Sequence, residues 1–254
     1  MPDDFSSIGP DLPDPFRLLV RDSVGSTNDE IRKVADAGAP EGLIILADRQ
    51  TEGRGRRGAA WFSPAGESLA FSVLLRPSEP KALWPRLALT AGLAVAEALE
   101  EYVPLVGIKW PNDVWAGGRK IAGILVEAGR DFAVVGIGLN VNTLSFPDEV
   151  AETATSLALE SGSGVSRADV LAAIIRRLSL RRHQIGTDFP EVIGSIRLRC
   201  VLTGQKVSLT AAAGPLSGTV GGISPQGELL LRTADGLQAL LQADEVRILR
   251  EPTS

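Results

Sequence analysis

The sequence predicts an α+β fold, because helical and antiparallel strand patterns come in blocks instead of alternating along the chain. The 254 residues are 44% hydrophobic and 22% charged, which is typical of a globular protein with a sizeable core. After Cys200 the pattern changes to short alternating strands separated by glycine and proline, which indicates a small β-barrel. We therefore expect a flexible leader at 1–15, a main domain at 16–200 and a C-terminal domain at 201–254.

The main domain is expected to open with a strand and a capped helix. The pattern at 16–24 predicts a strand, and a helix then begins in which Thr27 and Glu30 have the spacing of a capping box. A short apolar run at 43–47 predicts a strand buried on both faces, which leads into a glycine-rich basic loop at 53–58. The later elements are expected as a strand at 68–75, an Ala-rich helix at 84–101, a strand at 106–110, a hairpin and meander at 114–141, a helix at 167–185 capped by Ser166, and C-terminal strands at 205–210, 216–223, 228–232, 237–242 and 246–249.

Charge and composition exclude several classes of function. The net charge of −5 disfavours a surface for nucleic acid, and the segment 1–15 has no room for a DNA-reading helix-turn-helix, so we expect no DNA binding. One cysteine, Cys200, cannot form an internal disulfide, and no secretory or membrane-spanning pattern is present, which indicates a cytoplasmic protein without membrane contact. His183 is the only histidine, so zinc binding and Cys/His catalysis lack the residues that they need.

The loop at 53–58, with the sequence GRGRRG, has the chemistry of an anion site. Glycine lets backbone N–H groups approach an anion closely, and arginine supplies planar positive charge. The loop matches neither the Walker pattern nor the dinucleotide-binding fingerprint. A solvated loop or an RNA-binding patch is the alternative that the loop alone leaves open.

Two further segments combine charged and polar residues. The segment KWPND at 109–113 suits either a polar site or a simple turn between strands. In KIAGILVE at 120–127, Lys120 begins an apolar strand and Gly123 leaves space beside the backbone, so the ammonium group can face an anion in a pocket. The alternative for Lys120 is an edge-strand lysine that opposes aggregation.

Several polar and glycine-rich segments follow one another in a fixed order along the chain. They are Ser26-Thr27-Asn28, Gln50-Thr51, GRGRRG at 53–58, WFSP at 61–64, KWPND at 109–113, KIAGILVE at 120–127 and GIGLNVN at 136–142. This order resembles that of the biotin protein ligases. The resemblance implies a catalytic domain like those of class II aminoacyl-tRNA synthetases, with a mixed sheet and helices, followed by a small SH3-like β-barrel. It also implies the monofunctional class, which lacks an N-terminal DNA-binding domain.

A two-step ligase reaction is what the resemblance implies. Biotin and ATP, with Mg²⁺, would give biotinyl-5'-AMP and pyrophosphate, and the biotinyl group would then pass to a lysine of a biotin carboxyl carrier protein domain. The first step needs two anions held in line and no general base, because the biotin carboxylate is already ionised. The rivals are a lipoate or octanoate protein ligase and, from another class, a nucleic-acid binding module.

Carried over residue by residue, the family pattern implies a set of site residues. Lys109, Asn112 and Asp113 would serve phosphate, magnesium and local architecture, and no residue is singled out as a metal ligand. Lys120, Arg54 and Arg56 are expected to be catalytic, because they would bracket the biotin carboxylate and the α-phosphate. The biotin-binding residues are expected to be Ser26, Thr27, Asn28, Gln50, Arg54, Gly55, Arg56, Lys120 and Gly123. The ATP-binding residues are expected to be Arg54, Arg56, Arg57, Trp61, Lys109, Asn112, Asp113, Lys120 and Asn140.

Three finer expectations concern motion, a departure from the family and assembly. The loop at 53–58 is expected to be mobile and to close over biotinyl-5'-AMP. Ala59-Ala60 stand where the family often carries arginine or another polar residue, which departs from the family's nucleotide contacts. The apolar strand at 132–141 is expected to extend the sheet across a homodimer.

Overall fold

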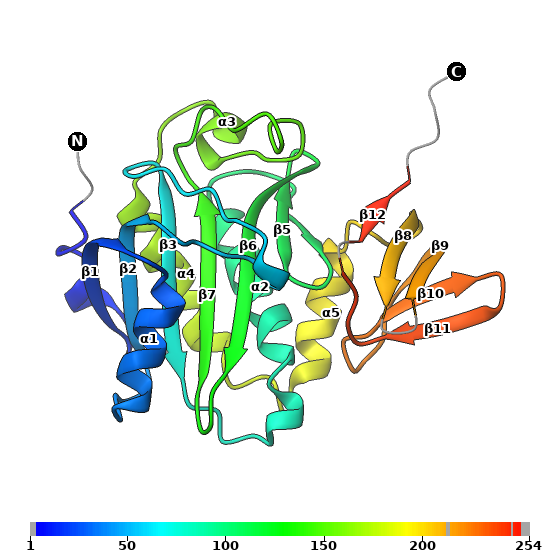
Figure 1. The fold of residues 1–254 in the computed structure, drawn as a ribbon, viewed down its shortest axis with the longest axis horizontal. Coiled ribbons are helices and arrows are strands. Elements are labelled where there is room, and N and C mark those ends of the chain that lie inside the picture. Colours follow the sequence, from blue (N-terminus) through cyan, green and yellow to red (C-terminus); the bar gives the residue numbers. More distant parts are fainter. Residues whose placement is uncertain (1–3, 212–213, 245, 250–254) are drawn as a thin grey trace.

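A computed structural model describes residues 4–211, 214–244 and 246–249, which form a larger sheet domain and a smaller C-terminal sheet (Figure 1). The larger sheet has seven strands in the order β1-β2-β3-β7-β6-β5-β4, and the smaller has five in the order β11-β10-β9-β8-β12. β1 pairs with β2 in parallel, and the other neighbouring strands of the larger sheet are antiparallel. The mixed sheet and the C-terminal antiparallel sheet confirm the predicted α+β class.

The helices and strands follow the expected order along most of the chain. The larger sheet contains β1 (Arg17–Val24), β2 (Leu43–Gln50), β3 (Ser68–Leu75), β4 (Gly107–Lys109), β5 (Asp113–Ala116), β6 (Arg119–Ala128) and β7 (Ala133–Asn140). The helices are α1 (Thr27–Asp36), α2 (Arg86–Leu99), α3 (Leu157–Ser161), α4 (Arg167–Arg181) and α5 (Phe189–Arg199). The C-terminal strands are β8 (Lys206–Ala211), β9 (Gly214–Ile223), β10 (Leu229–Thr233), β11 (Gly236–Leu240) and β12 (Arg247–Ile248).

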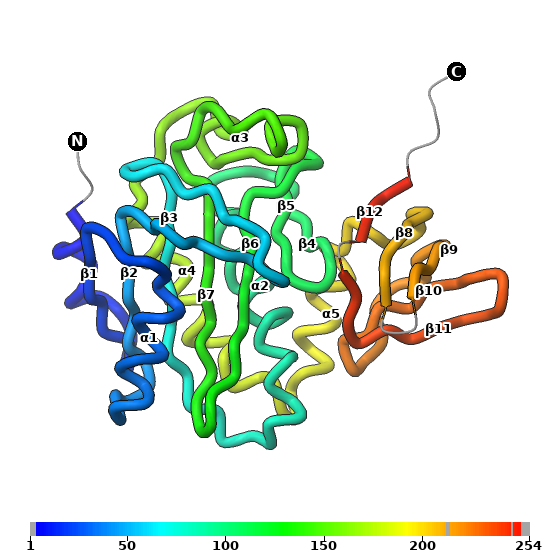
Figure 2. Tube along the Cα trace, in the orientation of Figure 1, coloured from blue at the N-terminus to red at the C-terminus, as the bar shows by residue number. Residues whose placement is uncertain are grey.

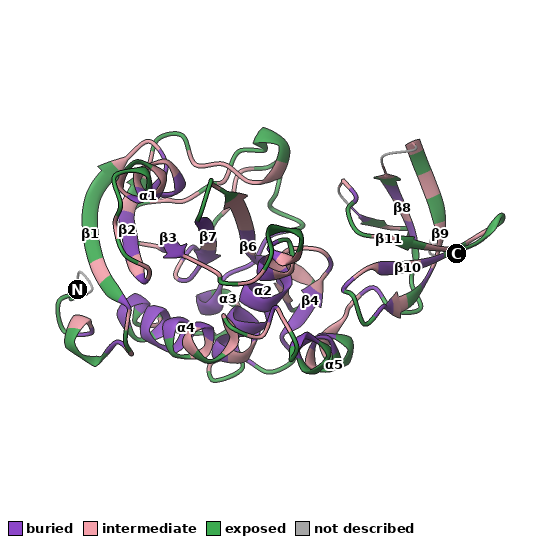
Figure 3. Ribbon diagram, turned by 90° about the horizontal axis from the view of Figure 1, so that it is seen from below, coloured by how far each residue is buried: buried purple, intermediate pink, exposed green. Residues whose placement is uncertain are grey.

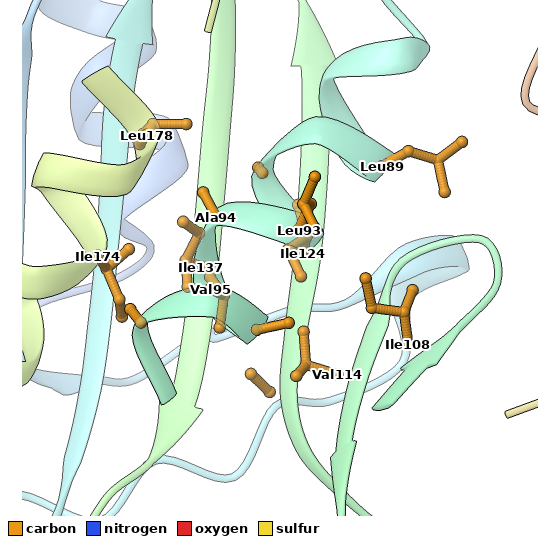
Figure 4. Close-up of a cluster of buried hydrophobic side chains, with 14 of the residues drawn as sticks. Leu89, Leu93, Ala94, Val95, Ile108, Val114, Ile124, Ile137, Ile174 and Leu178 are labelled. Atoms are coloured by element: carbon orange, nitrogen blue, oxygen red, sulfur yellow. The ribbon is translucent and has the colours of Figure 1, made fainter. Parts of the chain in front are cut away.

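Alternation of side chains along β3 gives the larger sheet two different faces. Successive residues of a strand point to opposite sides, so Leu69 and Phe71 lie on one face while Ala70 and Ser72 lie on the other. The face with Leu69 and Phe71 packs into the main core, where side chains of α2 and α4 meet each other and the sheet (Figure 4). Because the opposite face carries small residues, it leaves room for a cleft.

Helix α1 covers part of this opposite face. Its residues Ile31 and Ala35 form a small buried cluster with Leu74 of β3 and Val134 of β7. Towards the other end of the same strands, the side chains become smaller, with Ser72 and Gly136 paired across β3 and β7. The cleft described below begins where this cluster ends.

The C-terminal sheet packs against the larger domain through apolar and polar contacts. Trp110 is 2% exposed, and its Nε1 donates a hydrogen bond of 2.9 Å to the backbone oxygen of Gly227. Arg197 of α5 donates from Nε to the backbone oxygen of Ile223 at 2.7 Å. These contacts hold the C-terminal sheet beside β4 and α5 (Figure 2), where it can form a wall of the cleft.

One expectation about the sheet is wrong. The strand predicted at 132–141 is β7, which lies inside the sheet between β3 and β6 and is hydrogen-bonded along both edges. An internal strand has no free edge, so β7 cannot extend the sheet across a homodimer. The largely exposed strand at one end of the sheet is β1, which is mostly green in Figure 3.

Two local expectations also need correction. The predicted flexible leader packs on the main core, since Ile8 and Leu12 are each only 7% exposed. The N-cap of α1 is Ser26, and Thr27 bonds to Gln50 instead of forming a capping box with Glu30.

Residues 1–3 of the leader and 250–254 of the C-terminal domain lie outside the described residues. Within the described ranges, no helix has the length and apolar character needed to cross a bilayer.

Candidate functional site

A cleft of about 1570 Å³ opens between the small-residue face of the larger sheet, the loop at 53–58 and the C-terminal sheet. All the residues predicted for the site line this cleft except Asn140. A second loop, at 150–155, and the C-terminal domain also contribute residues that the sequence did not predict. They are Val150, Glu152, Thr153, Ser208, Leu209, Thr210, Pro215, Leu216, Ser217, Asp244, Arg247 and Ile248.

Glycines on two neighbouring strands form the floor of the cleft. Gly123 of β6 pairs with Gly138 of β7, and the indole ring of Trp61 lies against both. A side chain at position 138 would collide with that ring, and one at Gly136 would collide with the amide oxygen of Asn28. The absence of side chains therefore allows a flat ring to lie directly on the sheet.

A buried polar network occupies one end of the floor. Gln50 Oε1 accepts hydrogen bonds from the backbone N–H of Thr27 at 2.9 Å and from its hydroxyl at 3.1 Å. The hydroxyl of Ser72 lies 2.7 Å from Thr27 Oγ1 and 2.6 Å from Asn28 Oδ1. Asn28 Nδ2 in turn donates to Glu127 Oε2 at 2.7 Å. These bonds fix the orientation of each amide, so the network presents defined donors and acceptors.

Arg54 is held by two carboxylates beside this network. Its guanidinium donates to both oxygens of Asp29 at 2.7 Å and lies 3.3 Å from Glu127. The hydrogen bonds to Asp29, together with the nearby charge of Glu127, raise the pKa of Arg54 above its ordinary value. The same contacts hold the pKa of the Asp29 carboxyl below its ordinary value. The pair is therefore fully charged at neutral pH and anchors the loop at 53–58 to the start of α1.

Replacing Asp29 by asparagine is expected to make this loop about three- to tenfold more sensitive to trypsin, because the bidentate pair opposes local opening. Since the pKa of Asp29 is lowered in the folded protein, the pair is complete above pH 3.8 and is lost only as pH falls further. The substitution is thus needed to break it at the pH of the assay. Cleavage after Arg56 and Arg57 is followed by mass spectrometry.

The matched control is Asp131→Asn, which breaks the exposed Arg76–Asp131 pair away from the cleft. This variant should be cleaved in the loop at the wild-type rate. Raised salt should reduce the difference in loop cleavage rate between Asp29→Asn and wild type. The Asp29 carboxylate is partly exposed, so salt screens its attraction to Arg54. Equal loop cleavage in Asp29→Asn and wild type at low salt would show that the pair does not restrain the loop.

The other two arginines of the loop reach across the cleft. Arg56 donates to Asn112 Oδ1 at 3.2 Å and to the backbone oxygen of Ala243 at 2.6 Å. Burial lowers the pKa of Arg56, and the charge of Asp113 opposes this effect. Arg57 forms an ion pair with Asp244. Because these partners lie on the larger sheet and in the C-terminal domain, the loop connects both walls of the cleft.

Lys120 and Asp113 form an ion pair on the floor next to Trp61. The ammonium group of Lys120 lies 2.7 Å from Asp113 Oδ1 and 5.5 Å from the centroid of the Trp61 ring. The backbone of Lys120 is also fixed, since its N–H donates to Thr153 O and its carbonyl accepts from Thr155 N. The strand and the second loop thus hold a lysine charge at one defined place in the cleft.

Lys109 and Asn112 lie on the same side of the cleft as Lys120. The ammonium group of Lys109 lies over the ring of Trp115, 4.8 Å from its centroid. Asn112 bonds through its side-chain nitrogen to the backbone oxygen of Ile124 at 2.9 Å and through its backbone oxygen to the N–H of the same residue. Asn112 therefore fixes the KWPND segment to β6 while its side-chain oxygen accepts from Arg56.

Asn140 was predicted to bind the nucleotide, but it does not line the cleft. Its side chain is 4% exposed, and its Nδ2 donates to the backbone oxygen of Thr155 at 3.0 Å. The bond ties the end of β7 to the segment that holds the backbone of Lys120. Asn140 is therefore a buried support of the second loop in this structure.

Sequence reasoning also missed three residues that hold the predicted site residues in place. Asp29 and Glu127 hold Arg54, and Ser72 joins Thr27 to Asn28. Only Ser72 carried a usable signal, because a serine in the otherwise apolar run at 68–75 needs a hydrogen-bond partner when it is buried. Glu127 ended a recognised motif, but its partner lies far away in the sequence.

The arrangement suits the binding of two anions beside a small polar ring system. Cationic side chains converge on one cleft whose floor is flat and whose end presents fixed amide and hydroxyl groups. In the part of the chain that the structure describes, no group of three or more His, Cys, Asp or Glu residues could hold a metal ion. The cations that line the cleft are Arg54, Arg56, Arg57, Lys109, Lys120 and Arg247.

Two family models match the chain. Residues 21–142 match the biotin/lipoate A/B protein ligase family, and residues 203–244 match the biotin protein ligase C terminal domain. The first match contains the floor, the polar network and all three loop arginines. The second contains most of the C-terminal sheet that forms the far wall of the cleft.

Comparison with known proteins gives relatives along nearly the whole chain. The biotin--[acetyl-CoA-carboxylase] ligase of Mycobacterium tuberculosis is 35% identical over 92% of this chain and 90% of its own length. The bifunctional ligase/repressor BirA of Bacillus subtilis is 34% identical over 89% of this chain and 73% of its own length. Among solved structures, the biotin protein ligase from Aquifex aeolicus in complex with biotin and ATP has a TM-score of 0.83 and 34% identity over 91% of this chain and 99% of its own.

Proposed function

The chain belongs to the biotin/lipoate A/B protein ligase family, and we propose that it activates biotin as biotinyl-5'-AMP and transfers it to a lysine of a biotin carboxyl carrier protein domain. One observation carries this proposal: Arg56 and Lys120 come together in one cleft at neighbouring residues, Asn112 and Asp113, beside a floor of glycines. The solved relative binds biotin and ATP, which is the pair of ligands that the proposal requires.

The first step is an in-line displacement at phosphorus. A carboxylate oxygen of biotin attacks the α-phosphorus of ATP, a new P–O bond forms, and the bond to the β-phosphate oxygen breaks with release of pyrophosphate. The reactants repel each other, so the site must neutralise them and hold them in line. We assign this role to Arg54, Arg56 and Lys120, and biotin recognition to Ser26, Thr27, Asn28, Gln50, Gly55 and Gly123.

The nucleotide is assigned to the side of the cleft nearer β4 and the C-terminal sheet. Arg57, Lys109, Asn112 and Asp113 supply charge and hydrogen bonds there. Trp61, whose ring lies on the glycine floor beside Lys120, offers a flat surface to the nucleotide. In the second step, the amine of the acceptor lysine attacks the acyl carbon, the C–O bond to AMP breaks, and the amine nitrogen passes a proton to the carboxylate of Asp113. AMP leaves with the electron pair of the broken bond.

Mg²⁺ is proposed to enter with the phosphates of ATP. It neutralises phosphate charge when bound, and it usually keeps several waters while using only one or two protein oxygens. Asp113 and Asn112 offer such oxygens within the cleft, although Lys120 and Arg56 contact them here. This donor set fits an ion held mainly by substrate phosphates.

Incubating the full chain with biotin, Mg-ATP and a biotin carboxyl carrier domain tests the function. Mass spectrometry should find one added biotinyl group on a single lysine of the carrier. Without the carrier, biotin should still drive the release of pyrophosphate. The proposal would be contradicted if the carrier remained unmodified and biotin caused no release of pyrophosphate.

A lipoate ligase is the runner-up, and ligand-dependent thermal stability separates the two. A ligand that binds only the folded state raises the melting temperature in proportion to its saturation. Biotin with Mg-ATP should give a large rise, and lipoate with Mg-ATP a much smaller one. The match of residues 203–244 to the biotin protein ligase C terminal domain favours the first ligand.

A further inference from the structure

We propose that Trp115 is a positioning residue, whose ring holds the Lys109 ammonium group where the outer phosphates of the nucleotide bind. The inference rests on the proposed function, because it assigns a role within the nucleotide side of that cleft. Both residues line the cleft, and the Lys109 nitrogen lies 4.8 Å from the centre of the Trp115 ring. That distance is within the range in which an aromatic face attracts a cation.

The strand register explains how the two side chains meet. β4 and β5 are antiparallel, with Gly107 opposite Trp115 and Lys109 opposite Asp113. Trp115 and Lys109 are therefore diagonal neighbours on one face of the sheet, a separation that long and aromatic side chains can span. Gly107 carries no side chain beside the ring.

The unpaired indole nitrogen of Trp115 indicates that this residue acts through the face of its ring and not through a hydrogen bond. Its Nε1 is buried and has no hydrogen-bond partner among the described residues. Leaving a buried donor unpaired opposes folding, and a leucine or phenylalanine would fill space here without that penalty. A tryptophan gives the strongest cation–π attraction of the aromatic side chains, which is what Lys109 receives.

The positions of the two cleft lysines separate their roles. Lys120 is the second residue of β6, next to the glycine floor, whereas Lys109 is the last residue of β4, two strands further along the sheet. Two strand spacings amount to about 10 Å. With Lys120 at the α-phosphate, Lys109 is placed towards the phosphates that depart as pyrophosphate. A lysine side chain is flexible, so a ring that restricts it lowers the entropy lost when phosphate binds.

The test is a double-mutant cycle read through steady-state pyrophosphate release. Trp115→Leu should raise the KM for ATP about three- to thirtyfold and leave the KM for biotin unchanged. Trp115→Phe keeps an aromatic face and should stay within about threefold of wild type. In a Lys109→Met background, Trp115→Leu should add no further loss, because the cation that the ring holds is already gone.

Lys81→Met is the matched control, since Lys81 also lies over a tryptophan ring, 5.5 Å from the centroid of Trp84, but does not line the cleft. It should leave the KM for ATP unchanged. Should Trp115→Leu fail to fold, the same cycle is run with Trp115→Phe, which should show a smaller loss that also disappears with Lys109→Met.

A loss that persists in the Lys109→Met background would overturn the inference, as would an equal rise in the KM for both substrates. An unchanged KM for ATP in Trp115→Leu would overturn it too. Wild-type protein that releases no biotin-dependent pyrophosphate would instead remove the proposed function, so the two failures are distinguishable.

Discussion

Replacing Lys120 by alanine is expected to lower the rate of biotin-dependent pyrophosphate release by at least about a hundredfold. The Lys120 ammonium group lies 2.7 Å from Asp113 and next to the Trp61 ring, and its side chain is 35% exposed. A charge in such a partly enclosed place interacts with a developing negative charge more strongly than it would in bulk water. Its loss should therefore act mainly on the chemical step, with kcat reduced more than the KM for biotin is raised.

Lys120→Gln distinguishes the effect of losing the charge from the effect of losing the side chain's packing contacts. Glutamine can still donate a hydrogen bond to Asp113, but it carries no charge, so we expect a loss as large as that of Lys120→Ala. Lys81→Ala is the control for a lysine outside the cleft and should keep wild-type activity. The melting temperatures of all variants show whether the fold is intact. Near-normal pyrophosphate release by a folded Lys120→Gln would contradict a charge-neutralising role.

The sequence predicted correctly those helices and strands whose hydrophobic periodicity matches their burial. The apolar run at 43–47, the buried strand at 68–75 and the Ala-rich helix became β2, β3 and α2, because hydrophobic periodicity and burial agree in them. The C-terminal strands were also predicted close to their observed bounds from their glycine and proline boundaries. Helices α3 and α5 were missed: α3 is only one turn long, and Pro190 lies in the first turn of α5.

Long-range pairing was not predictable in the same way. β7 reads as an apolar strand whether it lies at an edge or in the centre, and only its pairing with β3 and β6 shows which. The segment at 1–15 was predicted to be flexible because it is short, acidic and rich in proline, yet Ile8 and Leu12 are buried in the core. Burial of so few side chains leaves almost no periodic signal.

The site shows the same division between local motif and distant partner. The arginine loop, Lys120 and the residues of α1 were predicted because each motif brings its own chemistry. Asp29 and Glu127, by contrast, act on Arg54 from other elements, and no spacing in the sequence links them. Asn140 was placed in the cleft by its motif, but alternation and burial direct its side chain to Thr155.

Replacing Arg54 by methionine is expected to weaken biotin binding about thirty- to hundredfold. The substitution removes a cation from the end of the cleft assigned to biotin. It leaves Asp29 without its bidentate partner, and it leaves Glu127 with Arg32 at 3.8 Å as its remaining cation. Two carboxylates that have lost their shared cation repel the carboxylate of biotin, so the loss of affinity should exceed that of one missing contact. Isothermal titration calorimetry with biotin measures it, and Arg17→Met, which breaks the exposed Arg17–Asp14 pair, should bind as wild type does.

A second substitution distinguishes repulsion from loss of loop structure. Adding Glu127→Gln to Arg54→Met removes one of the exposed negative charges while keeping a side chain that can accept from Asn28. If repulsion contributes, the double variant should recover part of the lost affinity, and raised salt should help the single variant more than the double one. If Arg54 served only to order the loop, the double variant would bind biotin no better than Arg54→Met, because nothing in it restores the anchor between Arg54 and Asp29.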